Sequence, residues 1–136
     1  MDMEYSFEIF DFSFDLSFVS GDQFFSKSKV AVQMLEIVCQ GEGQVDEVCK
    51  LICKNRTRLT YEQDSQLRNR YVNLAIFHFK CDGGKFNITY LPGPPLQVPI
   101  QDGKLSFEIR TLHDDKILDF SQKIKRVWVR LSIKHV

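Results

Sequence analysis

The stretch YSFEIFDFSFDLSFV, residues 5–19, decides the fold. From Phe10 to Phe18 every second residue is apolar and the residues between are Asp or Ser, the pattern of a half-buried strand. From Tyr5 to Ile9 the apolar residues alternate in the opposite phase. Because a slip of one residue turns every side chain to the other face, the switch at Ile9–Phe10 predicts a bulge or a break into two strands.

Outward from this stretch, two segments have helical spacing. The apolar residues of the first, which ends before Gly41, are Val30, Ala31, Met34, Leu35 and Val38. A second helix is predicted from about Val45, since Val45, Val48, Cys49 and Ile52 fall at i, i+3, i+4 and i+7. Acidic residues at its start and lysines at its end suit the helix dipole.

The second half of the chain is predicted to be mostly sheet. Tyr71–Lys80 is apolar enough for a central strand with both faces covered, whereas the prolines of 92–99 exclude a central position. Asp114 and Asp115 are expected to cap a short helix. The other predicted strands are Phe86–Tyr90, Leu105–Ile109 and Val127–Ile133. The predicted class is therefore α+β: one domain, residues 1–136, with two helices in its N-terminal half and one short helix in its C-terminal half packed on an antiparallel sheet.

Composition argues against catalysis. With 136 residues and 43% hydrophobic content the chain is long enough for one core, and no apolar run approaches the ~20 residues of a membrane span. The opening is acidic, unlike a signal peptide, so we expect a cytosolic or nuclear protein. The four cysteines lack metal-ligand spacing and are expected to be reduced and buried. No nucleophile–base pattern or phosphate loop occurs, so we expect no enzyme, metal or cofactor.

Charge is unevenly spread although the net charge is zero. Residues 1–26 carry six acidic side chains before the first lysine, at Lys27, whereas 50–70 and 116–136 are basic. Either the molecule pairs with itself or with anions through these regions, or acidic and basic elements are neighbours within one fold.

Residues 55–70 form a polar, aperiodic segment, which predicts an exposed and functional loop. The alternative is a short exposed helix over 62–70. The basic residues in and just before this segment, which could pair with an anion, are Lys50, Lys54, Arg56, Arg58, Arg68 and Arg70.

The order of these elements resembles that of rhabdovirus matrix proteins, and more distantly those of related negative-strand RNA viruses. The resemblance spans most of the chain: the aromatic strand Phe12–Val19, the helix Val30–Val38, the second helix and exposed loop, the segment Pro94–Pro99, and the strand Leu105–Ile109 followed by an acidic pair. No single motif is specific. The chain departs from such proteins in its acidic opening and in lacking a Pro-Pro-x-Tyr motif.

The resemblance implies a viral structural protein that self-associates and condenses the nucleocapsid at a membrane during virion assembly. Its partners would be further copies of itself, the nucleocapsid and, peripherally, an anionic membrane, without a small-molecule substrate. The resemblance implies that the six basic residues named above bind the nucleocapsid or the membrane. It also implies that the residues for self-association are Asp11, Asp15, Leu59 and Tyr61. Its location would be the virion and the host cytoplasm. Two alternatives remain: a β-rich adaptor that binds a peptide, or an RNA-binding viral accessory protein.

Overall fold

A computed structural model describes residues 2–41, 43–55, 71–91, 93–119 and 124–136. The fold is all-β, with 65% strand and no helix in the described residues, and it consists of two antiparallel sheets. The strands are β1 (Met3–Ile9), β2 (Ser13–Ser17), β3 (Lys29–Gly41), β4 (Val45–Cys53), β5 (Val72–Cys81), β6 (Phe86–Tyr90), β7 (Leu96–Pro99), β8 (Lys104–Thr111) and β9 (Ile124–Lys134). The predicted α+β class is therefore wrong.

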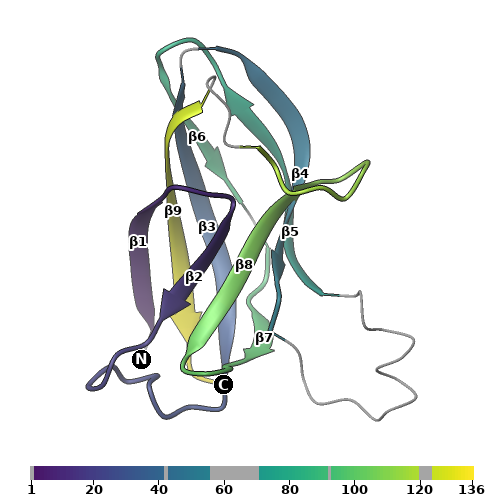
Figure 1. The fold of residues 1–136 in the computed structure, drawn as a ribbon. Helices are drawn as coiled ribbons and strands as arrows, with labels where there is room; N and C mark the ends of the chain where they lie inside the picture. The colour runs from purple at the N-terminus through teal and green to yellow at the C-terminus, as the bar shows by residue number, and fades with distance from the viewer. Residues whose placement is uncertain (1, 42, 56–70, 92, 120–123) are drawn as a thin grey trace.

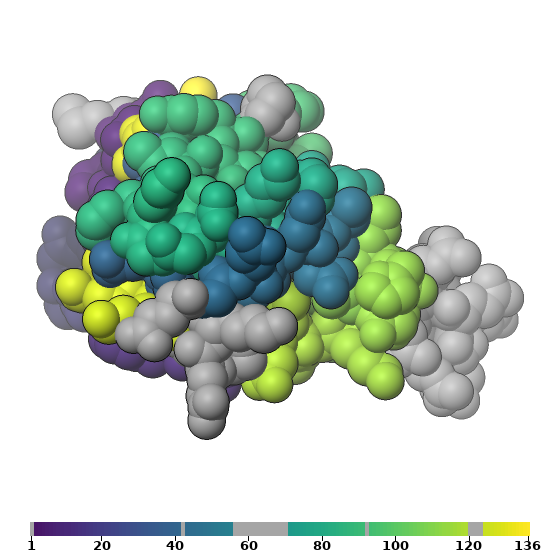
Figure 2. Space-filling model, turned by 90° about the horizontal axis from the view of Figure 1, so that it is seen from above, coloured from purple at the N-terminus to yellow at the C-terminus, as the bar shows by residue number. Residues whose placement is uncertain are grey.

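The two sheets pack face to face as a sandwich (Figure 1). Sheet A has the order β1-β9-β3-β6, with β7 also beside β3, and sheet B has the order β2-β8-β4-β5. At one end, seen in Figure 2, the β3–β4 and β5–β6 turns lie side by side. There the backbone N–H of Gly83 donates to the carbonyl of Gly43 at 3.2 Å. These turns carry the chain from one sheet to the other, so both sheets contribute to one core.

The predicted break in residues 5–19 is confirmed. β1 belongs to sheet A and β2 to sheet B, and the chain crosses between them at residues 10–12. Ile9 and Phe12, on either side of the crossing, are both buried, whereas Phe10 is 77% exposed. The two phases of alternation therefore point at the same core from opposite sheets. The rings of Phe7 and Phe14 meet across it with centroids 6.0 Å apart.

The first predicted helix is wrong: the residues form β3, the long strand at the centre of sheet A. Val30, Val32 and Met34 are buried, and beyond Glu36 the buried residues are the odd-numbered Ile37 and Cys39. The register against β9 shifts between Met34 and Glu36, which marks a β-bulge. A bulge inserts one residue and reverses the alternation, so two strand phases joined in this way imitate a helical period.

The second predicted helix is wrong for a related reason. Its residues form β4, which lies between β8 and β5 in sheet B. Cys49, Leu51 and Cys53 face the core, and Ile52 is buried too, next to a register shift between Leu51 and Ile52. Val48 is 45% exposed. Two side chains four residues apart lie on the same face of a helix and also of a strand. The spacing of Cys49 and Cys53 therefore fits either structure.

Two further predictions in the C-terminal half are wrong. β5 is an edge strand of sheet B with alternating exposure, so Tyr71–Lys80 does not form a central strand covered on both faces. Asp114 and Asp115 cap no helix in the described residues. They lie in a tight turn, where Asp114 accepts a hydrogen bond from the Thr111 hydroxyl and the Thr111 N–H donates to the Lys116 carbonyl at 2.9 Å. The strands Phe86–Tyr90, Leu105–Ile109 and Val127–Ile133 are confirmed, and β7 pairs with β3 alone, as its prolines indicated.

Asn55, two residues after the end of β4, makes hydrogen bonds to the connection between β7 in sheet A and β8 in sheet B. Its side chain is buried, and Nδ2 donates to the carbonyls of Pro99 and Lys104 at 2.9 Å each. Its Oδ1 accepts the backbone N–H of Ser106 at 2.8 Å. Pro99 belongs to sheet A and Lys104 to sheet B, so one amide connects both layers.

Asn55→Ala is expected to lower the free energy of unfolding by about 2–4 kcal/mol, because the hydrogen bonds of its buried side chain to Pro99, Lys104 and Ser106 are lost. Urea denaturation followed by circular dichroism measures the change. Asn73→Ala, at an exposed position on β5, is the matched control and should stay within about 0.5 kcal/mol of the parent. Equal midpoints for the two variants would contradict the role of Asn55.

All four cysteines are free and buried, as predicted. Burial raises the pKa of the Cys53 thiol to about 11 and that of Cys49 to about 12. Burial also raises the pKa of Cys39, together with its contact to Cys81. The folded state therefore favours the neutral thiol at Cys39, Cys49 and Cys53.

Stability should fall as pH rises above about 8.5, the pKa of a thiol in the unfolded chain, toward about 11, because only the unfolded state then ionises. Below that range the contribution is fully present, since both states are protonated. Urea midpoints from pH 7 to pH 10.5 measure the slope. The slope of Cys49→Ala should be flatter than that of the parent, and identical slopes would show that Cys49 makes no contribution.

Candidate protein-binding surface

The outward side of sheet A carries a group of apolar side chains at the β6 edge. In the strand register Val38 lies between Ile88 on β6 and Trp128 on β9. Phe86 and Tyr90 flank Ile88 on the same side of β6, because alternate residues share a face. We call Val38, Phe86, Ile88, Tyr90 and Trp128 the aromatic face.

The aromatic face is exposed although it is apolar. Phe86, Ile88 and Tyr90 are 62%, 52% and 67% exposed. The Phe86 and Trp128 rings lie 5.8 Å apart between centroids, and the Arg126 guanidinium lies 4.6 Å from the centroid of Trp128. Such a group of neighbouring apolar side chains on a sheet is more typical of a contact surface than of a surface facing only water.

Ion pairs border the aromatic face on the side of β1, β9 and β3. Arg126 pairs with Glu8 at 2.6 Å, and Arg130 pairs with Glu4 at 3.0 Å and with Glu36 at 3.1 Å. Hydrogen bonds to the arginine lower the pKa of Glu8 and raise that of Arg126. Acidic β1 and basic β9 are therefore neighbours in one sheet, which confirms the intramolecular explanation for these two charged regions.

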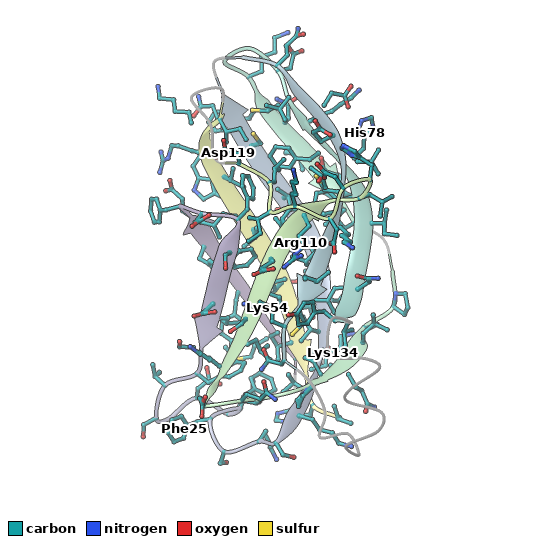
Figure 3. The ribbon with its side chains drawn as sticks, turned by 45° about the vertical axis from the view of Figure 1, so that its right-hand side comes forward. Phe25, Lys54, His78, Arg110, Asp119 and Lys134 are labelled. Carbon is teal, nitrogen blue, oxygen red and sulfur yellow. The ribbon has the colours of Figure 1, made fainter. Side chains whose placement is uncertain are left out.

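The two predicted anion-binding lysines of the described chain lie on the outer side of sheet B. Lys50 pairs with Asp115 at 2.8 Å, and Lys54 pairs with Glu108 at 3.3 Å. Arg110, labelled with Lys54 in Figure 3, donates to Glu108 through Nε at 2.8 Å and lies 5.9 Å from the ring centroid of Tyr71. Their charges are therefore matched by carboxylates within the fold, which leaves less positive charge for an external anion.

The other predicted site residues do not gather at one place. Arg56, Arg58, Arg68, Arg70, Leu59 and Tyr61 lie outside the described residues, as does most of the predicted loop 55–70. Asp11 is exposed in the crossing between β1 and β2. Asp15 lies on β2 and pairs with Lys104 of the neighbouring strand at 3.5 Å. Neither aspartate lies on the aromatic face.

A catalytic or metal site would require a cluster of titratable side chains, usually in a hollow. In residues 2–41, 43–55, 71–91, 93–119 and 124–136 no group of three or more His, Cys, Asp or Glu side chains could hold a metal ion. His78 and Asp46 form a close pair on the outer side of sheet B, where both side chains are more than half exposed. A hollow of about 340 Å³ at the turn end is lined by Gln44, Asp46, Lys80 and Asp82 among others. The part of the chain that the structure describes contains no helix able to cross a membrane.

Comparisons with known protein families, with curated proteins and with solved structures found no match to this chain. The candidate surface therefore stands on its geometry alone.

The sequence analysis missed the aromatic face. Phe86, Ile88 and Tyr90 alternate with Asn87 and Thr89, and an alternating strand shows which residues share a face without showing which face is buried. The partner strand shows which face is buried: Ile37 and Cys39 of β3, which lie opposite Thr89 and Asn87, are buried, so Asn87 and Thr89 are on the inward side of β6. Recognising it required the β3–β6 pairing.

Glu108→Ala is expected to lower the free energy of unfolding by about 1.5–3 kcal/mol, because its buried carboxylate accepts charged hydrogen bonds from Arg110 and faces Lys54. Thermal denaturation at neutral pH measures the loss. Glu36→Ala, whose carboxylate is more exposed and pairs with Arg130, is the control and should cost less. The reverse order would show that the sheet B ion pairs contribute little.

Proposed function

We propose that this chain is a non-enzymatic structural protein that works by self-association through the aromatic face of sheet A. The observation that carries the proposal is the exposure of Phe86, Ile88 and Tyr90 side by side at one edge of the sheet. Removing such side chains from water is the main favourable contribution to most protein association, about 25 cal/mol per Å² of apolar surface.

The electrostatics of sheet A support the same proposal. The charges nearest the aromatic face are largely balanced: Glu8 pairs with Arg126, and Arg130 lies between Glu4 and Glu36, which leaves one excess negative charge. An approaching copy would therefore meet little net charge of either sign, and the zero net charge of the chain adds little long-range repulsion. An apolar patch bordered by polar, ion-paired side chains is found in many protein interfaces.

Self-association is also the central part of the function implied by the resemblance to viral matrix proteins. The two helices that contributed to that resemblance are strands β3 and β4, so the order of elements gives it less support than the sequence suggested. The further roles at a nucleocapsid and an anionic membrane remain hypotheses that depend on Lys50, Lys54, Arg56, Arg58, Arg68 and Arg70. The ion pairs of Lys50 and Lys54 weigh against a leading part for these two residues.

Sedimentation velocity over protein concentrations from about 1 µM to 1 mM tests the proposal, since Kd values in this range correspond to about 4–8 kcal/mol. The parent should shift from monomer to larger species as concentration rises, and the fluorescence of Trp128, the single tryptophan, should change in parallel. Phe86→Ser with Tyr90→Ser should move the transition to at least about tenfold higher concentration.

Val48→Ser with Ile76→Ser is the matched control, because these residues are 45% and 61% exposed on the outer side of sheet B. This variant should associate like the parent. A parent that stays monomeric throughout the range, or equal effects of the two double variants, would overturn the proposal. Co-sedimentation with anionic vesicles at low salt would test the membrane role separately.

A further inference from the structure

Edges of β-sheets normally carry features that prevent another strand from adding to them, such as charges, prolines or short length. Four of the edge strands described here have them. β1 carries Glu4 and Glu8, β2 carries Asp15, β5 carries His78 and Lys80, and β7 carries Pro99. β6 is also short, with five residues, but its sequence Phe-Asn-Ile-Thr-Tyr contains no charge and no proline.

The backbone of β6 is oriented for further pairing. The N–H of Leu91 donates to the carbonyl of Leu35 at 3.0 Å, which fixes the phase of the β3–β6 ladder. In an antiparallel ladder hydrogen-bonded and non-hydrogen-bonded pairs alternate, so Asn87 and Thr89 bond to β3. The N–H and C=O groups of Phe86, Ile88 and Tyr90 therefore point away from β3, to an edge that no strand in the described residues occupies.

The residue pattern of β6 is symmetric about Ile88. Aromatic residues stand two positions to either side, and the small polar residues Asn87 and Thr89 stand next to it. If two β6 strands lay antiparallel with Ile88 opposite Ile88, Phe86 of each copy would face Tyr90 of the other. Asn87 would face Thr89. Aromatic pairs of this kind stabilise neighbouring strands.

We propose that a second copy of this chain pairs antiparallel with β6 along its open edge, with Ile88 of the two copies opposite each other. This inference rests on the proposed self-association and specifies its geometry. About six backbone hydrogen bonds would form, two for each facing pair. The two A sheets would become one continuous sheet across the twofold axis.

The pairing also extends the outer rows of side chains. The row of Trp128, Val38 and Ile88 continues into Ile88, Val38 and Trp128 of the second copy, so that the aromatic faces merge. In the adjoining row Phe86, next to Gln40, meets Tyr90, next to Glu36. No two like charges face each other in these rows. A second copy satisfies this symmetry by construction, whereas a strand of another protein would need to reproduce it.

Spin labels test the register. Ile88→Cys and Phe86→Cys give labelling sites that are exposed, whereas the four native thiols are buried. In the proposed dimer the two 88 positions lie about 5.5 Å apart between Cα atoms, and the two 86 positions, offset by four residues, lie about 14 Å apart. Labels at 88 should show strong dipolar broadening and labels at 86 much less. Ile76→Cys, on sheet B, is the control and should show none beyond background.

Ile88→Glu tests the interface by function. Two carboxylates would face each other at the twofold axis, so the dissociation constant from sedimentation should rise at least about tenfold. Ile76→Glu places the same change on the outer side of sheet B and should leave it unchanged. Both variants keep the apolar core intact, and circular dichroism verifies their folding.

The outcomes separate this inference from the proposed function. Concentration-dependent association with strong broadening at 88 and weak broadening at 86 supports both. Association with equal broadening at 86 and 88, as in face-to-face packing of the sheets about 10 Å apart, would overturn edge pairing and leave self-association standing. A chain that stays monomeric at all concentrations would overturn both the edge pairing and the proposed self-association. This holds even if β6 then binds a strand of a different protein.

Discussion

The structure depends on burying apolar side chains from two sheets against each other. When the chain passes from one sheet to the other, its apolar side chains must therefore still point to the core. The crossing between β1 and β2 shows how this is achieved. Ile9 and Phe12 both reach the core while Phe10 between them is exposed, so the reversal of alternation coincides with the change of sheet. The turns between β3 and β4 and between β5 and β6 also carry the chain from one sheet to the other, so both sheets contribute to one core.

The outer sides of the two sheets can differ because core packing does not constrain the residues that face outward. Sheet B carries a compact set of ion pairs around Glu108 and Arg110, which balance the lysines at its surface. Sheet A carries ion pairs on β1, β3 and β9 and apolar side chains at the β6 edge. Sheet B also exposes Val48 and Ile76, but within the described residues Phe86, Ile88 and Tyr90 of sheet A are exposed together along one strand. For this reason the proposed activity is assigned to sheet A.

The sequence predicted a strand correctly where apolar and polar residues alternate without interruption along it. β8 and β9 were predicted because their inward residues, such as Phe107 and Val129, alternate over the predicted span. β3 and β4 were mistaken for helices because register shifts beside Leu35 and between Leu51 and Ile52 change the phase part-way. The aromatic face was not found because strand pairing, a long-range property, decides which side of β6 is buried. The predicted partners of Arg56 and its neighbours stay predictions.

The position of Asn55 has a consequence for covalent modification. Asn55-Arg56-Thr57 has the sequence pattern of an acceptor for an N-linked glycan, and the sugar would be attached at Nδ2. In the folded chain this nitrogen donates both of its hydrogens to carbonyls and its side chain is buried. A glycan on Nδ2 would break these hydrogen bonds and could not fit at the buried position. The folded protein therefore cannot be glycosylated at Asn55.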